Sequence, residues 1–272
     1  MPSAQSAARP TPMALTQVLD HLGAQPQSVA TFFDFDGVLS SIQDDPASVQ
    51  PTEGALDRIT SLASEVGVLA IVSGRPIDFL CQFFDQPNIA LSGLYGLEQR
   101  IEGELTVDPI AMEHLPTVQA ATESARAEFG EARVEDKTYS ITIHYRGETE
   151  EFAERLLAWA DETAARTGLL ARPAKKSVEL HPPVSRTKGS AVRDLVCDAE
   201  AAAYFGDDVG DLPAFEELAR LDGEGSLAAT ARVAVAGAEL PASMRSAATD
   251  VIDGPQAVLG VLDEFLAQIN RA

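Results

Sequence analysis

Cysteine is scarce in this sequence, with only two residues among 272, Cys81 and Cys197. Both lie in apolar segments with helical spacing, so we expect no structural disulfide and a reducing, cytoplasmic environment. Long apolar runs are absent too, because none approaches the roughly 20 residues that a membrane-spanning helix needs. The segment 1–17 has no basic patch followed by an apolar run, so we expect no signal peptide. These absences favour a cytoplasmic protein.

Positively charged residues are also few in this sequence. The chain has 20 Lys and Arg against 42 Asp and Glu, a formal net charge of −22. Such a surface has no excess of basic charge to neutralise phosphates, which argues against nucleic acid or an anionic membrane as a partner. A small anionic substrate is not excluded, because a local group of basic side chains, backbone amides and a metal ion could hold it. We therefore expect a small-molecule substrate and a monomer.

Apolar residues make up 45 % of the chain and are arranged in two alternating patterns. Solid apolar runs of strand length predict buried strands at 29–33, 68–72, 89–91, 202–205 and 232–236. Helical spacing between them predicts helices at 13–22, 52–66, 188–196 and 255–269. Strands of this kind that alternate with helices are typical of a doubly wound α/β fold, with a mostly parallel, Rossmann-like sheet.

The pattern changes after about residue 104. Two long amphipathic helices are predicted at 113–129 and 148–167, and alternating polar and apolar residues predict half-exposed strands at 139–145 and 177–180. We therefore expect an α+β cap domain, residues 105–184, inserted into a catalytic core made of 1–104 and 185–272. The first 12 residues, rich in Pro, Ala and Ser, are expected to form a loose tail.

Four polar signatures follow the predicted strands of the core or begin its helices, and the first is Asp34-Phe35-Asp36-Gly37. Ligands of open α/β sheets bind beyond the carboxyl ends of the strands. Gly37 lets the chain turn at once, so that both carboxylates can face one pocket. One could attack phosphorus while the other acts as general acid and then base. The alternative is an ordinary strand-end turn rich in Asp and Gly.

The second and third signatures could hold a phosphate. In Ser73-Gly74-Arg75, the hydroxyl group and the backbone amides are suited to a phosphoryl oxygen, although the segment is equally typical of a tight turn with Arg75 in solvent. Lys188 begins a predicted helix, where a positive charge is slightly unfavourable for the helix dipole. This placement indicates a role in neutralising phosphate and nucleophile, with a solvated lysine as the alternative.

The fourth signature, residues 206–211, places Asp207, Asp208 and Asp211 directly after a predicted strand. Three carboxylates within five residues repel one another unless a cation or buried donors offset them. Magnesium prefers hard oxygen ligands, and a carboxylate from this segment would suit it together with Asp34 and the backbone carbonyl of Asp36. Alternatively, Asp208 and Asp211 only cap the following helix.

The four signatures in this order resemble the haloacid dehalogenase-like hydrolases. Asp36 is a residue that the phosphatases and phosphomutases of that superfamily have and its dehalogenases lack. From about residue 32 to 266 the chain is similar, in more detail, to the trehalose-6-phosphate phosphatases. The segments that carry this similarity are Asp34 to Leu39 followed by Asp44-Asp45-Pro46, Gly93 to Glu98, Lys137 to Ser140, His144-Tyr145-Arg146, Lys176 with Glu179, and Lys188-Gly189.

The resemblance implies hydrolysis of trehalose 6-phosphate to trehalose and phosphate in trehalose biosynthesis, with Mg²⁺ as cofactor. It implies that Asp34 is the nucleophile and Asp36 the general acid and base, with Ser73 and Lys188 as further catalytic residues. Asp34, Asp36 and Asp207 would bind the metal, supported by Asp208 and Asp211. The substrate would contact Gly74, Arg75, Glu98, Lys137, His144, Arg146, Lys176 and Glu179.

Several positions depart from that family's pattern and leave the sugar open. Val38 and Tyr95 stand where a threonine and a histidine are usual, and Gly210 and Leu212 replace a threonine and a glutamate. The alternatives are a magnesium-dependent phosphatase for sucrose phosphate, mannosyl-phosphoglycerate or a monosaccharide phosphate, a phosphomutase, and a silent sugar-phosphate-binding protein. In the cap, a packing role for His144, a solvated Glu179, and surface charges at Lys137 and Arg146 are alternatives to sugar contacts.

Overall fold

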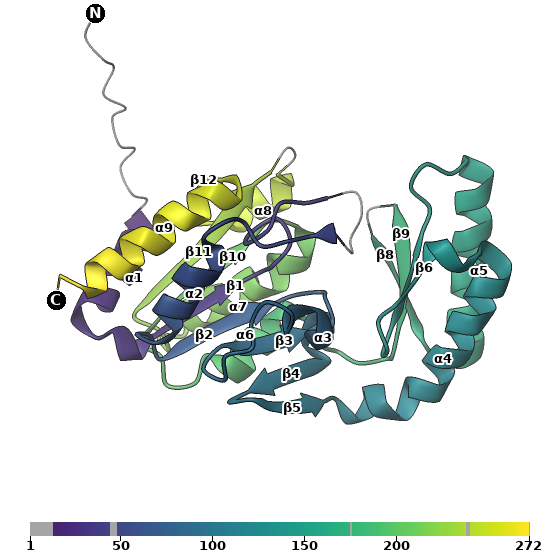
Figure 1. The fold of residues 1–272 in the computed structure, drawn as a ribbon, viewed down its shortest axis with the longest axis horizontal. Coiled ribbons are helices and arrows are strands. Elements are labelled where there is room, and N and C mark those ends of the chain that lie inside the picture. The colour runs from purple at the N-terminus through teal and green to yellow at the C-terminus, as the bar shows by residue number, and fades with distance from the viewer. Residues whose placement is uncertain (1–12, 44–47, 175, 238–239, 272) are drawn as a thin grey trace, which may run out of the picture. The chain divides into compact units, whose positions relative to one another are not determined.

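The computed structural model describes residues 13–43, 48–174, 176–237 and 240–271. The expected tail at 1–12 and the segment Asp44-Asp45-Pro46 lie outside the described residues. The chain divides into two compact units, which are described separately. The first unit combines Met1–Val72, Gln86–Ala90 and Lys188–Ala272, and the second combines Ser73–Asp85 and Leu91–Thr187 (Figure 1). The second unit contains the expected cap together with 73–85, 91–104 and 185–187, which the sequence pattern assigns to the core; the domain boundaries stay a prediction.

The first unit contains five parallel strands. They are β1 (Val29–Phe33), β2 (Val68–Val72), β10 (Ala201–Gly206), β11 (Ala229–Ala236) and β12 (Asp250–Asp253), in the order β12-β11-β10-β1-β2. Phe33 of β1 is in register with Phe205 of β10. Asp34 and Asp207, which come directly after these neighbouring strands, therefore lie at the same edge of the sheet.

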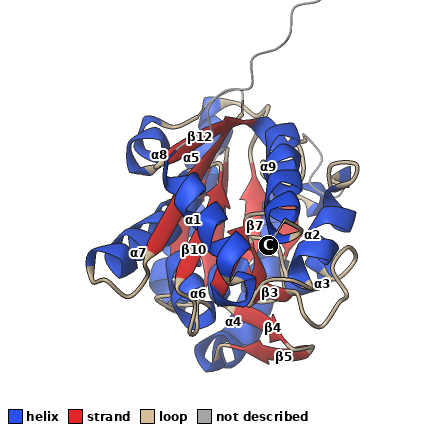
Figure 2. Ribbon diagram, turned by 90° about the vertical axis from the view of Figure 1, so that its left-hand side faces the viewer, coloured by secondary structure: helices blue, strands red, loops and turns tan. Residues whose placement is uncertain are grey.

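Helices cover both faces of this sheet (Figure 2). On one face lie α1 (Met13–Ala24), α2 (Ala55–Ala63) and α9 (Gly254–Ile269), and on the other α6 (Lys188–Leu195), α7 (Leu212–Gly223) and α8 (Ala242–Ala247). Alternation along the strands supplies a core to each face. Tyr204 packs against Phe215 of α7, and its neighbour Phe205 packs against Phe265 of α9. The predicted doubly wound α/β fold is confirmed.

The second unit contains a four-stranded antiparallel sheet with two long helices. The strand order is β6-β7-β9-β8, formed by β6 (Val134–Asp136), β7 (Ile141–His144), β9 (Ser177–His181) and β8 (Leu170–Ala174). The helices α4 (Pro109–Phe129) and α5 (Glu150–Thr167) contribute Phe129 and Trp159, whose rings meet edge to face at 5.4 Å between centroids. The long helices and the two strands expected from the sequence are present, but the expectation that these strands are half-exposed is wrong: β9 is buried throughout and β7 at all but its last residue.

The sequence pattern does not predict several short elements of the second unit. The second unit also holds the short helix α3 (Ile77–Leu80) and the antiparallel strands β4 (Glu98–Ile101) and β5 (Glu104–Val107), which follow β3 (Ala90–Gly93). Strand β5 is exposed over most of its length, and its polar and apolar residues alternate over four positions only. Both Cys81 and Cys197 have free thiols. Within the described part of the chain, no helix combines the length and the apolar character needed to cross a bilayer.

Candidate active site

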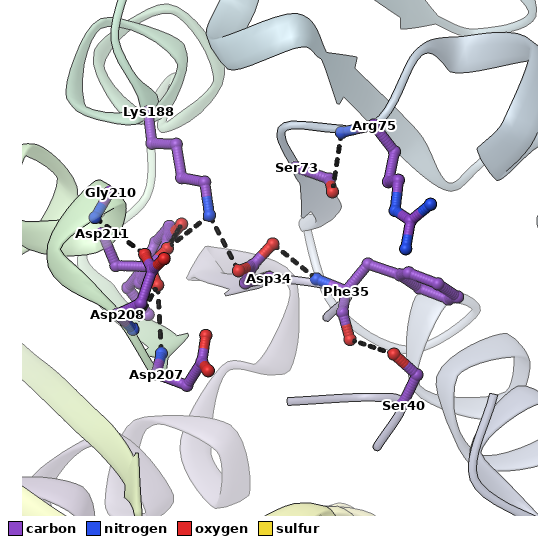
Figure 3. A network of polar contacts seen from close by, with 11 residues as sticks. Asp34, Phe35, Ser40, Ser73, Arg75, Lys188, Asp207, Asp208, Gly210 and Asp211 are labelled. Atoms are coloured by element: carbon purple, nitrogen blue, oxygen red, sulfur yellow. Dashed lines mark hydrogen bonds and ion pairs between the residues drawn. The ribbon is translucent and has the colours of Figure 1, made fainter. Parts of the chain in front are cut away.

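Asp34 and Asp36 lie in a tight loop that begins where β1 ends. Gly37 has φ +76°, a left-handed conformation that favours glycine, and its amide donates to the carbonyl oxygen of Ser40 at 2.9 Å. The hydroxyl group of Ser40 donates to the carbonyl oxygen of Phe35 at 2.9 Å, which closes the loop from the other side (Figure 3). The Asp34 side chain is buried, and its Oδ1 accepts the amide hydrogen of Phe35 at 2.7 Å. The loop thus fixes one carboxylate oxygen and leaves the other for a different partner.

That partner is Lys188, the first residue of α6. Its Nζ lies 2.8 Å from Oδ2 of Asp34 and 2.7 Å from Oδ1 of Asp211, and only 3 % of the side chain is exposed (Figure 3). Burial disfavours the charged ammonium group, but Asp211 and Asp34 outweigh it and raise the pKa of Lys188 well above its usual value. Lys188 is therefore a buried cation held between two carboxylates, and the alternative of a solvated lysine is wrong.

Asp211 organises this cluster and is fully buried. Its Oδ1 also accepts the phenolic hydrogen of Tyr204 at 2.7 Å. Its Oδ2 accepts the amide hydrogens of Asp207 at 3.0 Å and Asp208 at 3.3 Å. With four donors on two oxygens, Asp211 positions Lys188 and the loop that carries Asp207. Sequence reasoning missed Tyr204, whose position inside an apolar strand signals only packing.

Asp207 and Asp208 have different environments. Asp208 is exposed, and its Oδ1 accepts the amide hydrogen of Gly210 at 2.7 Å as part of a capping box. The capped element is the short 3-10 turn Val209–Asp211, whereas at α7 the N-cap residue Asp211 forms no capping hydrogen bond with its side chain, so the alternative of a cap on that helix is wrong. Asp207 is half-buried, and burial together with Asp211 and Asp208 raises its pKa to about 8. Burial also raises the pKa of Asp34 well above its usual value, although Lys188 opposes this.

These carboxylates have the chemistry of a site for a hard divalent cation. Asp34, Asp207 and Asp211 each offer one oxygen, and these atoms lie within 4.8 Å of one another. The donors are all oxygen, which suits Mg²⁺. The raised pKa values of Asp34 and Asp207 indicate that this site disfavours their negative charges, and a cation would compensate them. Because Asp211 is already saturated by its donors, Asp34 and Asp207 are the residues best able to bind a metal ion.

Gly37 provides the space for the Asp207 carboxylate. A Cβ atom at Gly37 would lie 2.1 Å from Oδ2 of Asp207. We expect Gly37→Ala to lower the free energy of unfolding by more than about 1 kcal/mol, the usual cost of this backbone conformation, because the clash adds to it. Urea denaturation measures the loss. Gly168→Ala is the matched control, since Gly168 has φ +77° and open space around it. Equal losses in the two variants would contradict a close approach of Asp207.

The raised pKa of Asp207 predicts how stability depends on pH in the absence of metal. A carboxyl group whose pKa rises from 3.8 to about 8 on folding favours the folded state while protonated, and this contribution is lost as the pH rises through that interval. We therefore expect wild-type protein in EDTA to lose unfolding free energy between about pH 5 and pH 8, and Asp207→Asn to lose less. Urea denaturation across this range measures both slopes, and parallel curves would contradict the prediction.

In the second unit, residues Ser73 to Arg75 form a turn directly after β2. Ser73 is buried, its amide donates to the carbonyl oxygen of Ser92 at 2.8 Å, and its Oγ accepts the amide hydrogen of Arg75 at 3.2 Å (Figure 3). The guanidinium group of Arg75 is half-buried and lies 4.5 Å from the centre of the Phe79 ring. A tight turn is therefore present, as one alternative expected, but Arg75 is not a fully solvated side chain. A Cβ at Gly74 would meet the Tyr95 ring at 2.9 Å.

Glu98, the first residue of β4, is buried. One carboxylate oxygen accepts the amide hydrogen of Ile77 at 2.8 Å, at the beginning of α3. Burial raises the pKa of Glu98 despite this hydrogen bond. Glu98 thus holds the turn that follows Ser73, and a contact to substrate would use its other oxygen.

The expected sugar-binding residues of the cap fall into two groups. Glu179 is buried on β9, accepts a hydrogen from the Ser140 hydroxyl group at 2.7 Å and lies 3.8 Å from Nζ of Lys137. His144 has a different partner: its Nε2 lies 3.0 Å from Oε2 of Glu135. The remaining two side chains, those of Arg146 and Lys176, are exposed. The buried position of Glu179 shows that it is not a solvated strand residue.

Sequence reasoning also missed two residues beside Glu179. Arg172 of β8 lies opposite Glu179 in the strand register, with Nη1 3.6 Å from its Oε2. His181 follows two residues after Glu179 on β9 and is buried as well. A signal for His181 exists in the sequence, because residues two apart on a strand share a face.

Comparison with known proteins identifies the relatives of this chain. The family model for trehalose-phosphatase matches residues 32–248. A trehalose-phosphate phosphatase of Mycobacterium ulcerans is 33 % identical over 200 residues, covering 70 % of this chain and 51 % of that protein. One from Mycobacterium marinum is 32 % identical with the same coverage. The chain thus spans about half the length of these relatives.

Solved structures agree on the fold. The C-terminal domain of the C. albicans trehalose-6-phosphate phosphatase superposes with a TM-score of 0.74 at 20 % identity, covering 96 % of this chain and 99 % of that one. A trehalose-6-phosphate phosphatase related protein gives a TM-score of 0.75 at 21 % identity, covering 90 % of this chain and all of the other. With the family model matched over most of its length, the chain belongs to the trehalose-phosphatase family.

Proposed function

We propose that this chain hydrolyses trehalose 6-phosphate to trehalose and phosphate, in the biosynthesis of trehalose. The observation that carries the proposal is the buried Lys188, held between Asp34 and Asp211 at 2.8 and 2.7 Å. A cation in this position can balance the negative charge of a nucleophile and of a phosphoryl group. Family membership supports the substrate class, and the relatives named above are trehalose-phosphate phosphatases.

The proposed reaction has two steps on one carboxylate. An oxygen of Asp34 attacks phosphorus, the bond between phosphorus and the sugar O6 breaks, and Asp36 gives its proton to the leaving oxygen. Asp36 then takes a proton from water, whose oxygen attacks phosphorus and breaks the aspartyl-phosphate bond. Phosphate leaves and Asp34 is regenerated. Lys188 opposes the larger effect of burial, which raises the pKa of Asp34, and so favours the ionised, reactive form in the first step.

We propose Mg²⁺ as the cofactor, held by the carboxylates of Asp34 and Asp207 and the backbone carbonyl of Asp36. Bound there, it would supply positive charge to the phosphoryl oxygens. Asp208 and Asp211 would act in support: Asp211 orients Lys188, and Asp208 caps the turn Val209–Asp211 that follows Asp207. Ser73, with the backbone of Gly74 and with Arg75, would bind phosphoryl oxygens.

The sugar contacts are proposed for the second unit. The buried Glu179 and the partly buried Lys137, 3.8 Å apart, form a polar pair suited to hydroxyl groups, and Glu98, His144, Arg146 and Lys176 complete the proposed set. Residues 105–184 would act as the cap that excludes water and supplies specificity. We further propose that the protein works as a cytoplasmic monomer.

The test is phosphate release from trehalose 6-phosphate, sucrose 6-phosphate and glucose 6-phosphate, with Mg²⁺ and with EDTA. We expect fast release from trehalose 6-phosphate alone, and only with Mg²⁺. Release from another sugar phosphate would support the proposed chemistry of the core but contradict trehalose 6-phosphate as the substrate. Tyr95, which departs from the family pattern, would then be the first residue to test as the cause. No release from any of them by folded protein would favour a silent sugar-phosphate-binding protein.

A further inference from the structure

A small cavity within the second unit has an unusual polar wall. The polar wall is formed by Tyr95, Arg172, Glu179, His181 and Arg186, and three aliphatic side chains close the rest. The cavity provides about 10 Å³ for the centre of a water-sized group. This is the space that a single water molecule or a single hydroxyl group requires. The cavity is therefore too small for a sugar ring and large enough for one hydroxyl group.

Two buried polar side chains stand next to each other in this wall. Glu179 and His181 occupy the same face of β9, two residues apart, and are 5 % and 7 % exposed. Glu179 has its partners in Ser140, Lys137 and Arg172. Buried polar groups are costly unless they form hydrogen bonds.

Within the part of the chain that the structure describes, His181 has a hydrogen-bond partner for one ring nitrogen and none for the other. Its Nδ1 lies 2.8 Å from the carbonyl oxygen of Pro182. Because a carbonyl oxygen can only accept, Nδ1 carries the hydrogen, and in the neutral ring Nε2 is then an acceptor. Burial, with a contribution from Arg172, lowers the pKa of His181, which keeps the ring neutral at pH 7. Among the described residues, none forms a hydrogen bond with Nε2.

The neighbouring Arg172 is held in place rather than mobile. Its guanidinium group lies 4.7 Å from the centre of the Tyr95 ring and 3.6 Å from Glu179. Tyr95 itself has φ +59°, a left-handed conformation that is rare for such a residue. Tyr95 thus supports Arg172 from one side while Glu179 holds it from the other. The cavity is therefore lined by three positioned groups: the carboxylate of Glu179, the guanidinium group of Arg172, and the imidazole ring of His181 with Nε2 available as an acceptor.

We propose that this cavity binds a single hydroxyl group of the sugar, and that His181 is a specificity-determining residue that accepts a hydrogen bond from it through Nε2. Arg172 would donate a hydrogen bond to the oxygen of the same hydroxyl group, and Glu179 would accept one from the neighbouring hydroxyl group of the sugar. The ligand class, a sugar phosphate, rests on the proposed function. The assignment of His181 rests on the cavity, its burial and its hydrogen-bonding state.

The test compares His181→Leu with His181→Gln in steady-state hydrolysis. Leucine removes the acceptor, whereas glutamine can place an amide oxygen near the position of Nε2. With the sugar phosphate that wild-type protein hydrolyses fastest, we expect His181→Leu to lower kcat/KM about tenfold or more, mostly through KM, and His181→Gln to restore most of it. With p-nitrophenyl phosphate, which has no sugar hydroxyl group, we expect all three proteins to react alike. His114→Leu, the same change on α4 in the same unit, is the matched control.

Monodeoxy analogues of that sugar phosphate separate recognition from folding. Wild-type protein should lose activity strongly at one hydroxyl position, and His181→Leu should show no further loss at that position. Equal losses with every analogue, or an equal loss with p-nitrophenyl phosphate, would overturn the role of His181. If His181→Leu does not fold, His181→Phe keeps a ring and removes the acceptor.

The same measurements distinguish a failure of the proposed function. Hydrolysis of a sugar phosphate other than trehalose 6-phosphate refutes the substrate, while the comparison of variants still decides the role of His181. Hydrolysis of p-nitrophenyl phosphate with no hydrolysis of any sugar phosphate refutes both.

Discussion

The variant Asp34→Asn is expected to lose at least about 10⁴-fold in kcat while remaining folded. The amide group is a poor nucleophile, so no covalent intermediate can form. The fold should persist because the substitution removes a buried charge along with its ion pair to Lys188, and Lys188 keeps its contact with Asp211 at 2.7 Å. Phosphate release measures the loss of turnover, and circular dichroism with urea denaturation measures the integrity of the fold.

A more direct readout is the covalent intermediate itself. Acid quenching of wild-type protein during turnover, followed by mass spectrometry, should detect a phosphorylated aspartate at Asp34 and none in Asp34→Asn. Asp198→Asn is the matched control, because Asp198 is an exposed carboxylate of the same unit. Substantial residual turnover in Asp34→Asn, or a phosphoryl group on another residue, would show that Asp34 is not the nucleophile.

The variant Lys188→Met is expected to lose both activity and stability. Removal of the ammonium group leaves Asp34 and Asp211 buried without their shared cation, and breaking a buried ion pair in this way costs about 3–5 kcal/mol. The effect should be larger at high pH, because the unpaired carboxylates must then stay ionised inside the protein. The loss in kcat should reach about 10³-fold, since electrostatic stabilisation of the phosphoryl group is lost as well.

Urea denaturation at about pH 5.5 and pH 8 measures the stability of Lys188→Met, and a double-mutant cycle assigns its cause. In the variant Asp34→Asn/Lys188→Met, one unpaired carboxylate is absent, so we expect the double variant to be more stable than Lys188→Met alone. Additive changes would mean that the 2.8 Å contact between Lys188 and Asp34 contributes nothing to stability. That outcome would also remove the physical argument for Lys188 as the counterion of the nucleophile.

The departures from the family pattern have different structural consequences. Val38 is fully buried, so its side chain contributes to the core at a position where a threonine is usual. Gly210 donates its amide hydrogen to Asp208 and leaves Asp207 and Asp211 in place. Tyr95 contacts Arg172 in the cavity of the second unit, so it is the departure that bears on the proposed binding of the sugar. These departures therefore leave the proposed core chemistry intact. Among them, Tyr95 is the residue that we expect to affect specificity for the sugar.

The fold of the first unit could be predicted largely from local patterns. Strands 29–33 and 68–72 were predicted with the boundaries that the structure has, because each is a solid apolar run with polar residues directly after it. Helix boundaries were less accurate: the helix predicted at 52–66 spans only Ala55–Ala63, since Gly54 has φ +81° and precedes its first turn. Strand β12 was missed because it has neither a solid apolar run nor a regular alternation, and β5 was missed because its alternation covers four positions only.

The sequence by itself determined the doubly wound core and the group of Asp34, Lys188 and Asp207, because parallel strands that follow one another around a sheet bring their carboxyl ends to one edge. Tertiary structure alone decided what each group contacts. It gave Asp211 four donors, paired His144 with Glu135, bound Glu98 to Ile77, and placed Arg172 between Tyr95 and Glu179. The physical reason is that these contacts join segments far apart in the chain. Their geometry is set by strand register and by left-handed backbone at single residues, and local composition specifies neither.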